Sequence, residues 1–503
     1  MSPEAAAGTP ELIQAPLAQS SKMQSSKYDT FQHPLAERNA SPEMVRIWSP
    51  RKKFSGWRRI WVALAKAQRK LGLTRITEEA ITQMEANVDN IDFALAEKLE
   101  TELGHDVMAH IHAFEAVAPA AKGIIQLGAT SMDINDNGDL LIMREALDVV
   151  ISKLVNVIDA IGTFAEKHKN LATLGYTHLQ VAQPTTVGKR ATLWCYDYLM
   201  ALETLEDIRK KFKLRGLKGA TGTQDSYMKL FDGDHAKVDE LERLFLEEIG
   251  GEGTECFPVT GQVYPRMADT DVIQALAKVA QAGHKMSNDI RVLSFVEEME
   301  EPVSEKQVGS TAMAYKRNPA KSERLTGLAR YAEHLPGIAA QTAAEQFLER
   351  TLDDSSTRRM TLPEAFLVCD GILIIETHVS RGMTVYPKII EKRLREKLPF
   401  MATEEILMRA VKAGGDRQEL HEAIRLHSRA AIERVKVEGL DNDLVERLKG
   451  DARFEKVNID ETLDPNRHIG RAPEQTEAFL RMYVDPVRTR FAHLLGMKAE
   501  LKV

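Results

Sequence analysis

The sequence has few of the features that mark secreted or membrane-spanning proteins. Its three cysteines, Cys195, Cys256 and Cys369, are far apart and odd in number among 503 residues. This pattern fits a reducing compartment, which we take to be the cytoplasm, better than a disulfide framework. No uninterrupted apolar run reaches the ~20 residues that a membrane helix needs. The segment 1–27 lacks the basic-then-apolar order of a secretory signal, and we expect it to be a disordered extension.

The common signatures of cofactor and metal sites are also missing. There is no Gly-rich phosphate loop of the Walker or Rossmann kind and no Cys/His pattern for zinc, which fits a reaction without a cofactor. Three histidines lie within 105–112, but no Glu follows His105 as the His-Glu-x-x-His pattern requires, so we expect no metal. The net charge of −7 argues against nucleic acid as a partner. An anionic small molecule remains possible, because a local basic cleft can oppose the overall sign.

Helical periodicity extends over most of the chain. Apolar residues at helical spacing predict helices near 57–71 and 140–164. The second has apolar residues on more than one face, which is typical of a helix inside a multi-helix bundle or an oligomer core. Strand signals are few, and the best are near 257–264 and 383–386. Further long helical candidates are 187–215, 269–298 and 320–348.

Two weak boundaries, near 128–131 and 382–387, divide these helices into three groups. We therefore expect a mostly α fold with three helical domains, of which the central one contains the long helices. After the extension, the expected domains are an N-terminal one at 28–130, a central one at 131–385 and a smaller C-terminal one at 386–503.

One stretch without periodicity, 307–318, places hydroxyls beside cations between Gly309 and Pro319. It reads Gln-Val-Gly-Ser-Thr-Ala-Met-Ala-Tyr-Lys-Arg-Asn. This composition suits a mobile loop that delivers a hydroxyl, from Ser310 or Thr311, to a substrate rich in carboxylates. A solvated basic loop is the alternative, and composition alone favours it.

The order of these residues, however, resembles the motif Gly-Ser-Ser-x-Met-Pro-x-Lys-x-Asn-Pro of the fumarase/aspartase superfamily. The ending Tyr-Lys-Arg-Asn-Pro resembles the adenylosuccinate lyase branch. Thr311 and Ala314 depart from the motif, but neither change removes the hydroxyl, amine or amide that the chemistry uses. The resemblance runs from about Phe31 to near the C-terminus through six separated motifs. It implies a homotetramer with a long helical bundle at its core and active sites that each draw motifs from three subunits.

The resemblance also implies a reaction, the release of fumarate from succinylated purine nucleotides by β-elimination without a cofactor. Ser310 would be the general base, and Lys316 and Asn318 would stabilise the charge that develops on the substrate carboxylate. His178, in a segment that resembles Thr-His-x-Gln-x-Ala-Gln-x-Thr-Thr, would protonate the leaving nitrogen. Glu323 would hydrogen-bond this histidine and fix its tautomer.

Two further motifs imply contacts with the succinyl group. Gly128-Ala-Thr-Ser131 precedes a predicted helix, whose N-terminus suits an anion, although a plain helix cap explains the motif equally well. By resemblance, Thr130 and Ser131 would hold a carboxylate of the succinyl group. His105 and Asp106 resemble the His-Asp pair of the family, in which the His lies in the active site and the Asp orders it.

The remaining matches imply contacts with the nucleotide. Arg350, Ser355 and Arg359 resemble the adenylosuccinate lyase motif, and with Arg324 they would form a basic pocket for the phosphate. A salt-bridge cluster is the alternative, since two aspartates stand at 353–354. The other expected contacts are the amide of Gln262 and the pair Arg38-Asn39, in which asparagine replaces the tyrosine of the family.

Two other interpretations stay open. The chain could be another lyase of the superfamily, acting on argininosuccinate, malate or aspartate, although the predicted phosphate pocket argues against this. It could also be a helical structural protein that kept the fold and lost the activity. The presence of all four predicted catalytic residues argues against that alternative.

Overall fold

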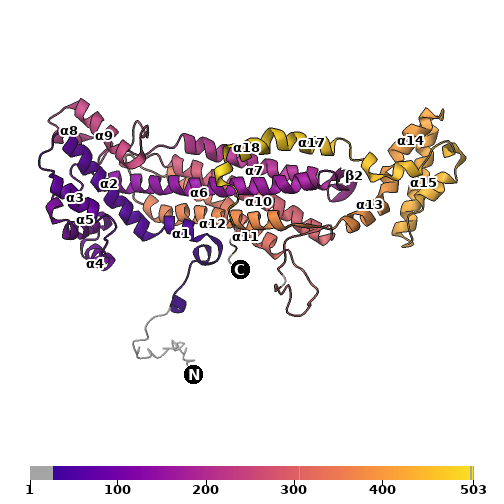
Figure 1. Ribbon diagram of the computed structural model, residues 1–503, viewed down its shortest axis with the longest axis horizontal. Helices are drawn as coiled ribbons and strands as arrows, with labels where there is room; N and C mark the ends of the chain where they lie inside the picture. The colour runs from indigo at the N-terminus through magenta and orange to yellow at the C-terminus, as the bar shows by residue number, and fades with distance from the viewer. Residues whose placement is uncertain (1–26, 305, 499–500, 502–503) are drawn as a thin grey trace, which may run out of the picture.

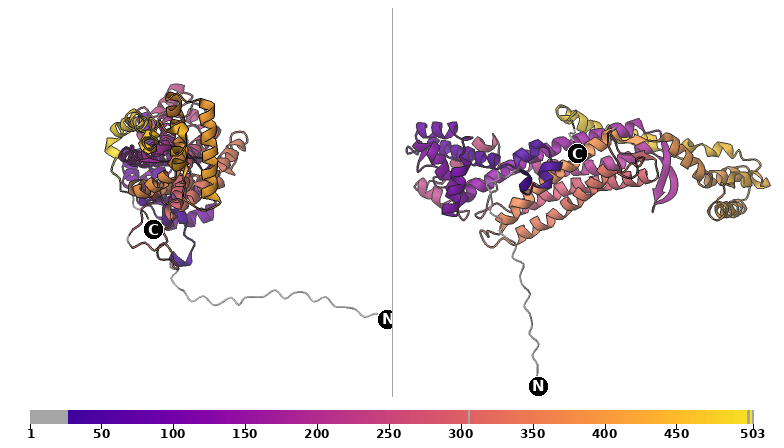
Figure 2. Two further views of the ribbon diagram at one scale, coloured as in Figure 1. Left: turned by 90° about the vertical axis from the view of Figure 1, so that its right-hand side faces the viewer. Right: turned by 90° about the horizontal axis from the view of Figure 1, so that it is seen from below.

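The computed structural model describes residues 27–304, 306–498 and 501. The molecule is elongated, with a bundle of long helices in the middle and a cluster of shorter helices at each end (Figures 1 and 2). The predicted mostly α fold is confirmed. Of the predicted extension 1–27, only Lys27 lies within the described residues, where it begins the short helical turn η1 (Lys27–Asp29).

The central bundle forms because its helices are apolar on more than one face. In the helix that contains the predicted segment 140–164, Leu147, Val150 and Leu154 are completely buried. Helices from other parts of the chain pack on both sides of it, which gives each apolar face a partner. The bundle helices are α6 (Ser131–Lys167), α7 (Val187–Lys210), α10 (Met267–Phe295), α11 (Ala320–Ala344) and α12 (Asp354–Gly382).

The cluster at the N-terminal end packs around α2, which contains the predicted helix 57–71. Trp57, Ile60 and Trp61 on this helix are almost completely buried, and Gly72, at φ +97°, follows the end of the helix. The helices of this end are α2 (Pro50–Lys70), α3 (Glu78–Ala86), α4 (Phe93–Leu103), α5 (Asp106–Val117), α8 (Asp225–Leu230) and α9 (His235–Gly250). Helix α1 (Pro42–Ile47) lies against the bundle, and its N-cap is Ser41.

The opposite end has a separate hydrophobic core, formed by buried residues between 402 and 459. Beyond it the chain returns along the bundle, where α17 and α18 pack on α6 and α7 (Figure 1). The helices are α13 (Pro387–Met401), α14 (Thr403–Lys412), α15 (Arg417–Lys436), α16 (Leu444–Lys449), α17 (Ala472–Phe479) and α18 (Asp485–Arg490). Short helical turns are η2 (Leu35–Asn39), η3 (Pro119–Ala121), η4 (Ala452–Phe454), η5 (Asp460–Leu463), η6 (Pro465–Arg467), η7 (Leu480–Val484) and η8 (Ala492–Leu494).

Two small antiparallel pairs of strands complete the fold. β1 (Ala172–Thr177) and β2 (Gln180–Thr186) form a hairpin that the sequence did not predict, with Thr177 opposite Gln180. Its turn consists of His178 and Leu179, whose φ angles of 54° and 56° match the two-residue turn that suits a twisted hairpin. β3 (Met299–Glu300) pairs with β4 (Thr384–Val385).

The second strand prediction is correct, and the first is wrong. β4 lies within the predicted strand 383–386, whereas 257–264 contains bends and no strand. Pro258 and Gly261 interrupt that segment, since proline lacks an N–H donor and glycine weakens a strand. Within the part of the chain that the structure describes, no helix is both long and apolar enough to span a membrane.

Candidate active site

The first group of predicted site residues lies where α6 begins. Thr130 is the N-cap of α6, and its backbone N–H donates to a carboxylate oxygen of Asp133 at 2.9 Å. Asp133 is completely buried and also accepts from the guanidinium of Arg215 and, at 3.1 Å, from the hydroxyl of Tyr227. A carboxylate with this many donors is fixed in place. The turn that carries Thr130 and Ser131 is therefore pre-organised to receive an anion.

Two predicted residues of the segment that begins α5 reach the same place. His105 accepts a hydrogen bond from the backbone N–H of Met108 at 3.4 Å, and its Nε2 lies 3.4 Å from Oγ of Ser131. Asp106 pairs with Arg359, at 3.2 Å between Oδ2 and Nη2. The contact implied between Asp106 and His105 is longer, 3.8 Å. The fold thus joins the starts of α5, α6 and α12 at one point.

The other histidines of the segment 105–112 have ordinary structural contacts. His110 is buried and stacks on Phe54, with ring centroids 3.7 Å apart. Burial lowers the pKa of His110 to about 4. His112 lies 3.0 Å from a carboxylate oxygen of Glu115. Across the described residues, no group of three His, Cys, Asp or Glu side chains is arranged to hold a metal ion.

A cavity of about 130 Å³ lies beside this turn and is lined by the predicted Arg350, Ser355 and Arg359. Nη1 of Arg350 donates to the side-chain oxygen of the predicted Gln262 at 3.0 Å. Nε of Arg350 is buried and has no hydrogen-bond partner among the described residues. A buried donor without a partner is costly, and a phosphate oxygen in the cavity would satisfy it.

A network of buried opposite charges supports the wall of this cavity. The guanidinium of Arg266 pairs with Asp136 at 3.0 Å and with Asp354 at 2.8 Å. Arg358 pairs with Asp269 at 2.8 Å. Burial opposes the charge of Arg358, but Asp269 and the other carboxylates nearby raise its pKa well above its usual value. Asp354 is thus buried in this network and not part of a surface salt-bridge cluster, and the predicted Arg350, Ser355 and Arg359 line the cavity beside it.

Arg324 does not line this cavity within one chain. Its Nε and Nη2 donate to the side-chain oxygen of the predicted Asn39 at 3.0 and 2.7 Å, and Nη2 also contacts the backbone oxygen of Arg38. Asn39 in turn packs on Gly371 of α12. Arg359 stands twelve residues earlier on that helix, or about 18 Å away at 1.5 Å per residue. The two predicted phosphate contacts, Arg324 and Arg359, are therefore apart within one chain.

The predicted base lies in the segment 303–318, between β3 and α11. Oγ of Ser310 accepts hydrogen bonds from the backbone N–H groups of Ala312 at 3.3 Å and Met313 at 3.0 Å. Lys316 is exposed a short distance along the same loop. Two amide donors favour an oxygen that carries negative charge.

The ends of this loop are tightly held. The side-chain amide of Asn318 donates to the backbone oxygen of Gly309 at 2.8 Å. A Cβ at position 309 would lie 2.1 Å from the backbone oxygen of Lys316, so only glycine fits there. The buried Glu301 accepts from the backbone N–H groups of Lys321 at 2.9 Å and Ser322 at 2.8 Å, at the start of α11. The loop is therefore closed at its base and exposed at its tip.

The predicted acid and its partner are not in contact. His178 is exposed at the tip of the β1–β2 hairpin, whose strands contact α13. Glu323 is exposed in the first turn of α11. Among the described residues no hydrogen bond joins the two side chains. The predicted pairing of His178 with Glu323 is therefore absent within one chain.

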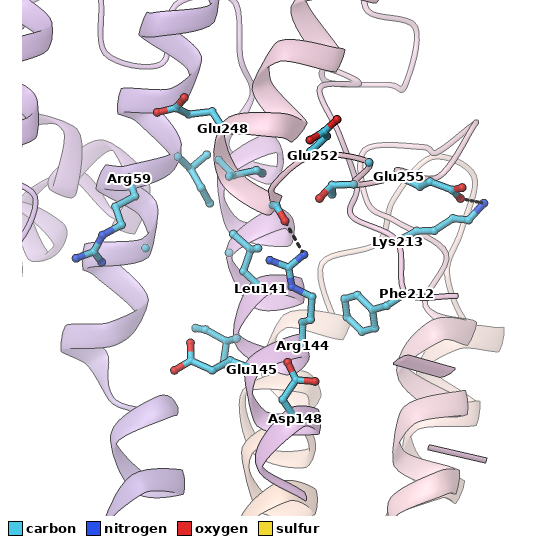
Figure 3. Close-up of a pocket in the computed structure, with 18 of the residues that line it drawn as sticks. Arg59, Leu141, Arg144, Glu145, Asp148, Phe212, Lys213, Glu248, Glu252 and Glu255 are labelled. Carbon is cyan, nitrogen blue, oxygen red and sulfur yellow. Dashed lines mark hydrogen bonds and ion pairs between the residues drawn. The ribbon is translucent and has the colours of Figure 1, made fainter. Parts of the chain in front are cut away.

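Figure 3 shows a larger groove, of about 1150 Å³, between α2, α6 and the ends of α7 and α9. It contains none of the predicted site residues. Several of its charged side chains pair with each other, as Lys213 does with Glu255 at 3.2 Å. Arg144 contacts the backbone oxygen of Gly250 at 3.4 Å. Because none of the predicted site residues lines this groove, we do not assign the candidate site to it.

Comparison with known proteins identifies the family. Residues 37–332 match the family described as Lyase, and residues 399–479 match the one described as Adenylosuccinate lyase C-terminus. The chain is 48% identical over 473 residues to the adenylosuccinate lyase of Saccharomyces cerevisiae, which covers 93% of this chain and 98% of the yeast protein. The chain belongs to the adenylosuccinate lyase family. It is accordingly an enzyme of the C–N lyase class.

Other adenylosuccinate lyases match over similar lengths. That of Schizosaccharomyces pombe is 48% identical over 472 residues, covering 93% of this chain and 98% of its own. That of Pyrococcus abyssi is 32% identical over 465 residues, covering 91% of this chain and 99% of its own. The C-terminal match favours this branch over the other lyases of the superfamily that the sequence motifs left open.

Solved structures show the same fold. The 3-carboxy-cis,cis-muconate lactonizing enzyme of Pseudomonas putida superimposes with a TM-score of 0.76 at 22% identity, covering 91% of this chain and 99% of its own. A fumarate lyase of Mesorhizobium sp. BNC1 gives 0.75 at 22% identity, covering 88% and 98%. At this identity the likeness establishes the fold alone.

Sequence reasoning missed the buried charges that support the candidate site. Asp133 stands three residues after Thr130, and this spacing is the signature of a capping box, so a local signal existed. Arg266 and Arg358 have no such signal, because their partners are far away in the sequence. Their role becomes visible only when α6, α10 and α12 are packed together.

Proposed function

We propose that the protein cleaves adenylosuccinate to AMP and fumarate, and succinylaminoimidazole carboxamide ribotide to the corresponding carboxamide ribotide. Membership of the adenylosuccinate lyase family supports this substrate class. The structural observation that carries the mechanism is the environment of Ser310, whose oxygen accepts two backbone N–H groups. A serine hydroxyl is a poor base unless its anion is stabilised, and these donors provide that stabilisation.

The elimination divides between a base and an acid. Ser310 removes a proton from the succinyl carbon next to a carboxylate, and the electron pair moves to form the double bond of fumarate as the C–N bond breaks. Thr130, Ser131, Lys316 and Asn318 stabilise the negative charge on the carboxylate. His178 gives its proton to the leaving nitrogen. Each hydrogen-bond donor that meets the developing negative charge on the carboxylate contributes roughly 10²–10³-fold to the rate.

The phosphate of the nucleotide fits the cavity near the start of α12. Among the described residues, Nε of Arg350 is buried and has no hydrogen-bond partner. The same is true of Nη1 of Arg266. Both residues line the cavity, together with Ser355 and Arg359. A dianionic phosphate would supply the acceptors that these donors lack. His105 and Gln262 lie close enough to this region to contact the same substrate.

The active site would be shared between chains of a homotetramer. One chain keeps the phosphate cavity, the pair of Arg324 with Asn39, the Ser310 loop and the His178 hairpin in separate places. A complete set of catalytic and substrate-binding residues therefore requires that neighbouring chains contribute to one site. The bundle also exposes apolar side chains that a second copy would cover. They include Met200 on α7, Phe295 on α10, and Tyr331 and Ile338 on α11.

The cytoplasm is the compartment that we propose for this enzyme. Cys195, Cys256 and Cys369 are all free. Burial raises the pKa of Cys195 to about 12 and raises that of Cys369 further, so both thiols stay protonated and inert. Free cysteines of this kind are usual in a reducing compartment.

The direct test is fumarate release by the purified protein from adenylosuccinate, argininosuccinate, aspartate and malate, side by side. We expect release from adenylosuccinate alone. Ser310→Ala should lower kcat by ~10²–10⁴-fold, the usual contribution of general acid–base catalysis, while calorimetry still detects adenylosuccinate binding. Thr311→Ala, which removes the neighbouring hydroxyl, is the matched control and should keep most of the activity. Equal losses in both variants, or lost binding in Ser310→Ala, would contradict the assignment of the base.

A further inference from the structure

Residues 298–301 form an acidic junction between the parts of the chain that carry the proposed acid and base. The junction follows α10 directly and leads into the Ser310 loop. It contains β3, which pairs with β4 two residues before α13 begins. Three of its four side chains are carboxylates, and each of them contacts a different element. Glu301 holds the start of α11, as described above.

Glu298 connects the hairpin to α13. Its side chain is 1% exposed, and Oε1 accepts from the hydroxyl of Tyr176 and from Nε of Arg393, both at 2.9 Å. Nη2 of Arg393 also donates to the hydroxyl of Tyr176 at 3.3 Å, which closes a triangle. Thr173 donates to Oε2 at 3.3 Å. Tyr176 and Thr173 both lie on β1, and Tyr176 stands two residues before His178.

Glu300 makes the equivalent connection for the loop. Its Oε2 accepts from the hydroxyl of Tyr386 at 2.7 Å, and Nη1 of Arg317 lies 3.3 Å from the same oxygen. Tyr386 immediately precedes α13, and Arg317 immediately follows Lys316 in the Ser310 loop. The segment around α13 is therefore bonded both to the hairpin and to the loop, through two carboxylates that are two residues apart.

We propose that Glu298 and Arg393 are positioning residues that fix the His178 hairpin against α13, and that Glu300 and Tyr386 fix the Ser310 loop in the same way. The proposal rests on the proposed roles of His178 and Ser310. A two-stranded hairpin has little stability of its own, so the position of its tip depends on what its strands contact. The triangle around the buried Glu298 is the contact that does this. α13 thus determines where the general acid lies.

The first experiment uses Tyr176→Phe and Arg393→Met in the full-length protein. Each variant removes one corner of the triangle, and with it two of the three bonds, but keeps most of the side-chain volume. We expect kcat to fall by up to about 100-fold, as a misplacement of about 1 Å does. KM should change much less, because the cavity lined by Arg350, Ser355 and Arg359 lies at the start of α12, at the other end of the bundle. Wild-type kcat in both variants would overturn the proposal.

A matched control lies on the same helix. Arg395 pairs at 2.5 Å with Glu391, and its side chain is largely exposed. Arg395→Met therefore removes the same charge and the same kind of bond from α13 without touching the triangle. Exposed pairs contribute little, so this variant should keep wild-type kcat. A loss equal to that of Arg393→Met would mean that α13 is sensitive in general, which would overturn the proposal.

The double variant Glu298→Gln/Arg393→Met separates positioning from stability. Arg393→Met leaves the buried Glu298 with less compensation, which lowers the thermal midpoint. Replacing Glu298 by glutamine removes that buried charge, so we expect the midpoint to recover in the double variant. Because the triangle is still broken, kcat should stay low. If kcat recovers together with the midpoint, Arg393 is merely structural and the proposal is wrong.

Parallel assays of the wild type and His178→Ala distinguish failure of this inference from failure of the function. If the wild type releases no fumarate from adenylosuccinate, the proposed function fails and the inference fails with it. If the wild type is active, His178→Ala is inactive and Arg393→Met is fully active, the inference alone fails.

Discussion

The turn at the start of α6 and the loop 303–318 both carry predicted site residues, but they are built in opposite ways. The turn is held from below by Asp133, which is completely buried among donors from three segments of the chain. The loop is held at its base by Glu301 and through Arg317 by Glu300, and Lys316 near its tip is exposed. Binding an anion needs a preformed set of donors. The general base, in contrast, must act in a site without bulk water, so it needs a segment that can close over the substrate.

The largest effect that we expect concerns the rigid turn. Asp133→Asn removes the negative charge from a buried pair and leaves the guanidinium of Arg215 uncompensated. Breaking such a pair costs about 3–5 kcal/mol, which urea unfolding of the variant would measure as a lower midpoint. Asp225→Asn is the control, because Asp225 makes an exposed pair with Lys229 and should cost below ~1 kcal/mol. If the two variants are equally stable, the buried pair does not stabilise the turn, and the turn is not the more rigidly built of the two regions.

A smaller effect depends on pH and tests the packing behind the turn. The pKa of His110 is about 4 in the folded chain and about 6.5 in an unfolded one. The unfolded chain therefore binds a proton first as the pH falls, so stability decreases between about pH 6.5 and pH 4 and this group has no effect above about pH 7. Between these pH values, the free energy of unfolding of His110→Phe should fall by on the order of 2–3 kcal/mol less than that of the wild type.

Urea unfolding at pH 7.5 and pH 4.5 measures this effect. The control is His235→Gln, since His235 is exposed and its replacement should leave the pH dependence as it is in the wild type. A pH dependence in His110→Phe identical to that of the control would contradict the buried, neutral state of His110.

The smallest effect compares binding with chemistry. Arg350→Lys keeps the charge in the cavity but loses the planar fork and the bond to Gln262. We expect KM to rise about tenfold, the value of one charge-assisted hydrogen bond, and kcat to change little. Lys316→Ala in the loop should do the reverse and lower kcat more than it raises KM. If both variants change the same parameter, the division between a binding turn and a catalytic loop is wrong.

The sequence predicted those parts of the fold that local patterns determine. The buried faces of α6 follow from apolar residues at helical spacing, such as Leu147 and Leu154, and Thr130 at its start follows from the motif. The hairpin was missed because β2 contains polar residues and Pro184, which are unusual in a strand. It is stable here because its base packs on α13 and on the junction 298–301.

The sequence motifs predicted the residues of the candidate site, but not which of these residues lie together in one folded chain. Motif order placed Arg324 and Arg359 in one pocket and His178 beside Glu323. In the folded chain these pairs are separate, because α11 and α12 run in opposite directions along the bundle and the hairpin extends from its end (Figure 1). Sequence motifs carry no information about which copy of a chain supplies each residue.

The measurement that tests the account most directly is complementation between two inactive variants. His178→Ala and Ser310→Ala are purified separately, dissociated, mixed in equal amounts and allowed to reassociate, and fumarate release from adenylosuccinate is then assayed. If one active site takes its acid and its base from different chains, about a quarter of the sites in a random mixture contain both intact residues. The mixture should then reach about a quarter of wild-type activity. Activity no higher than that of the separate variants would contradict sites shared between chains.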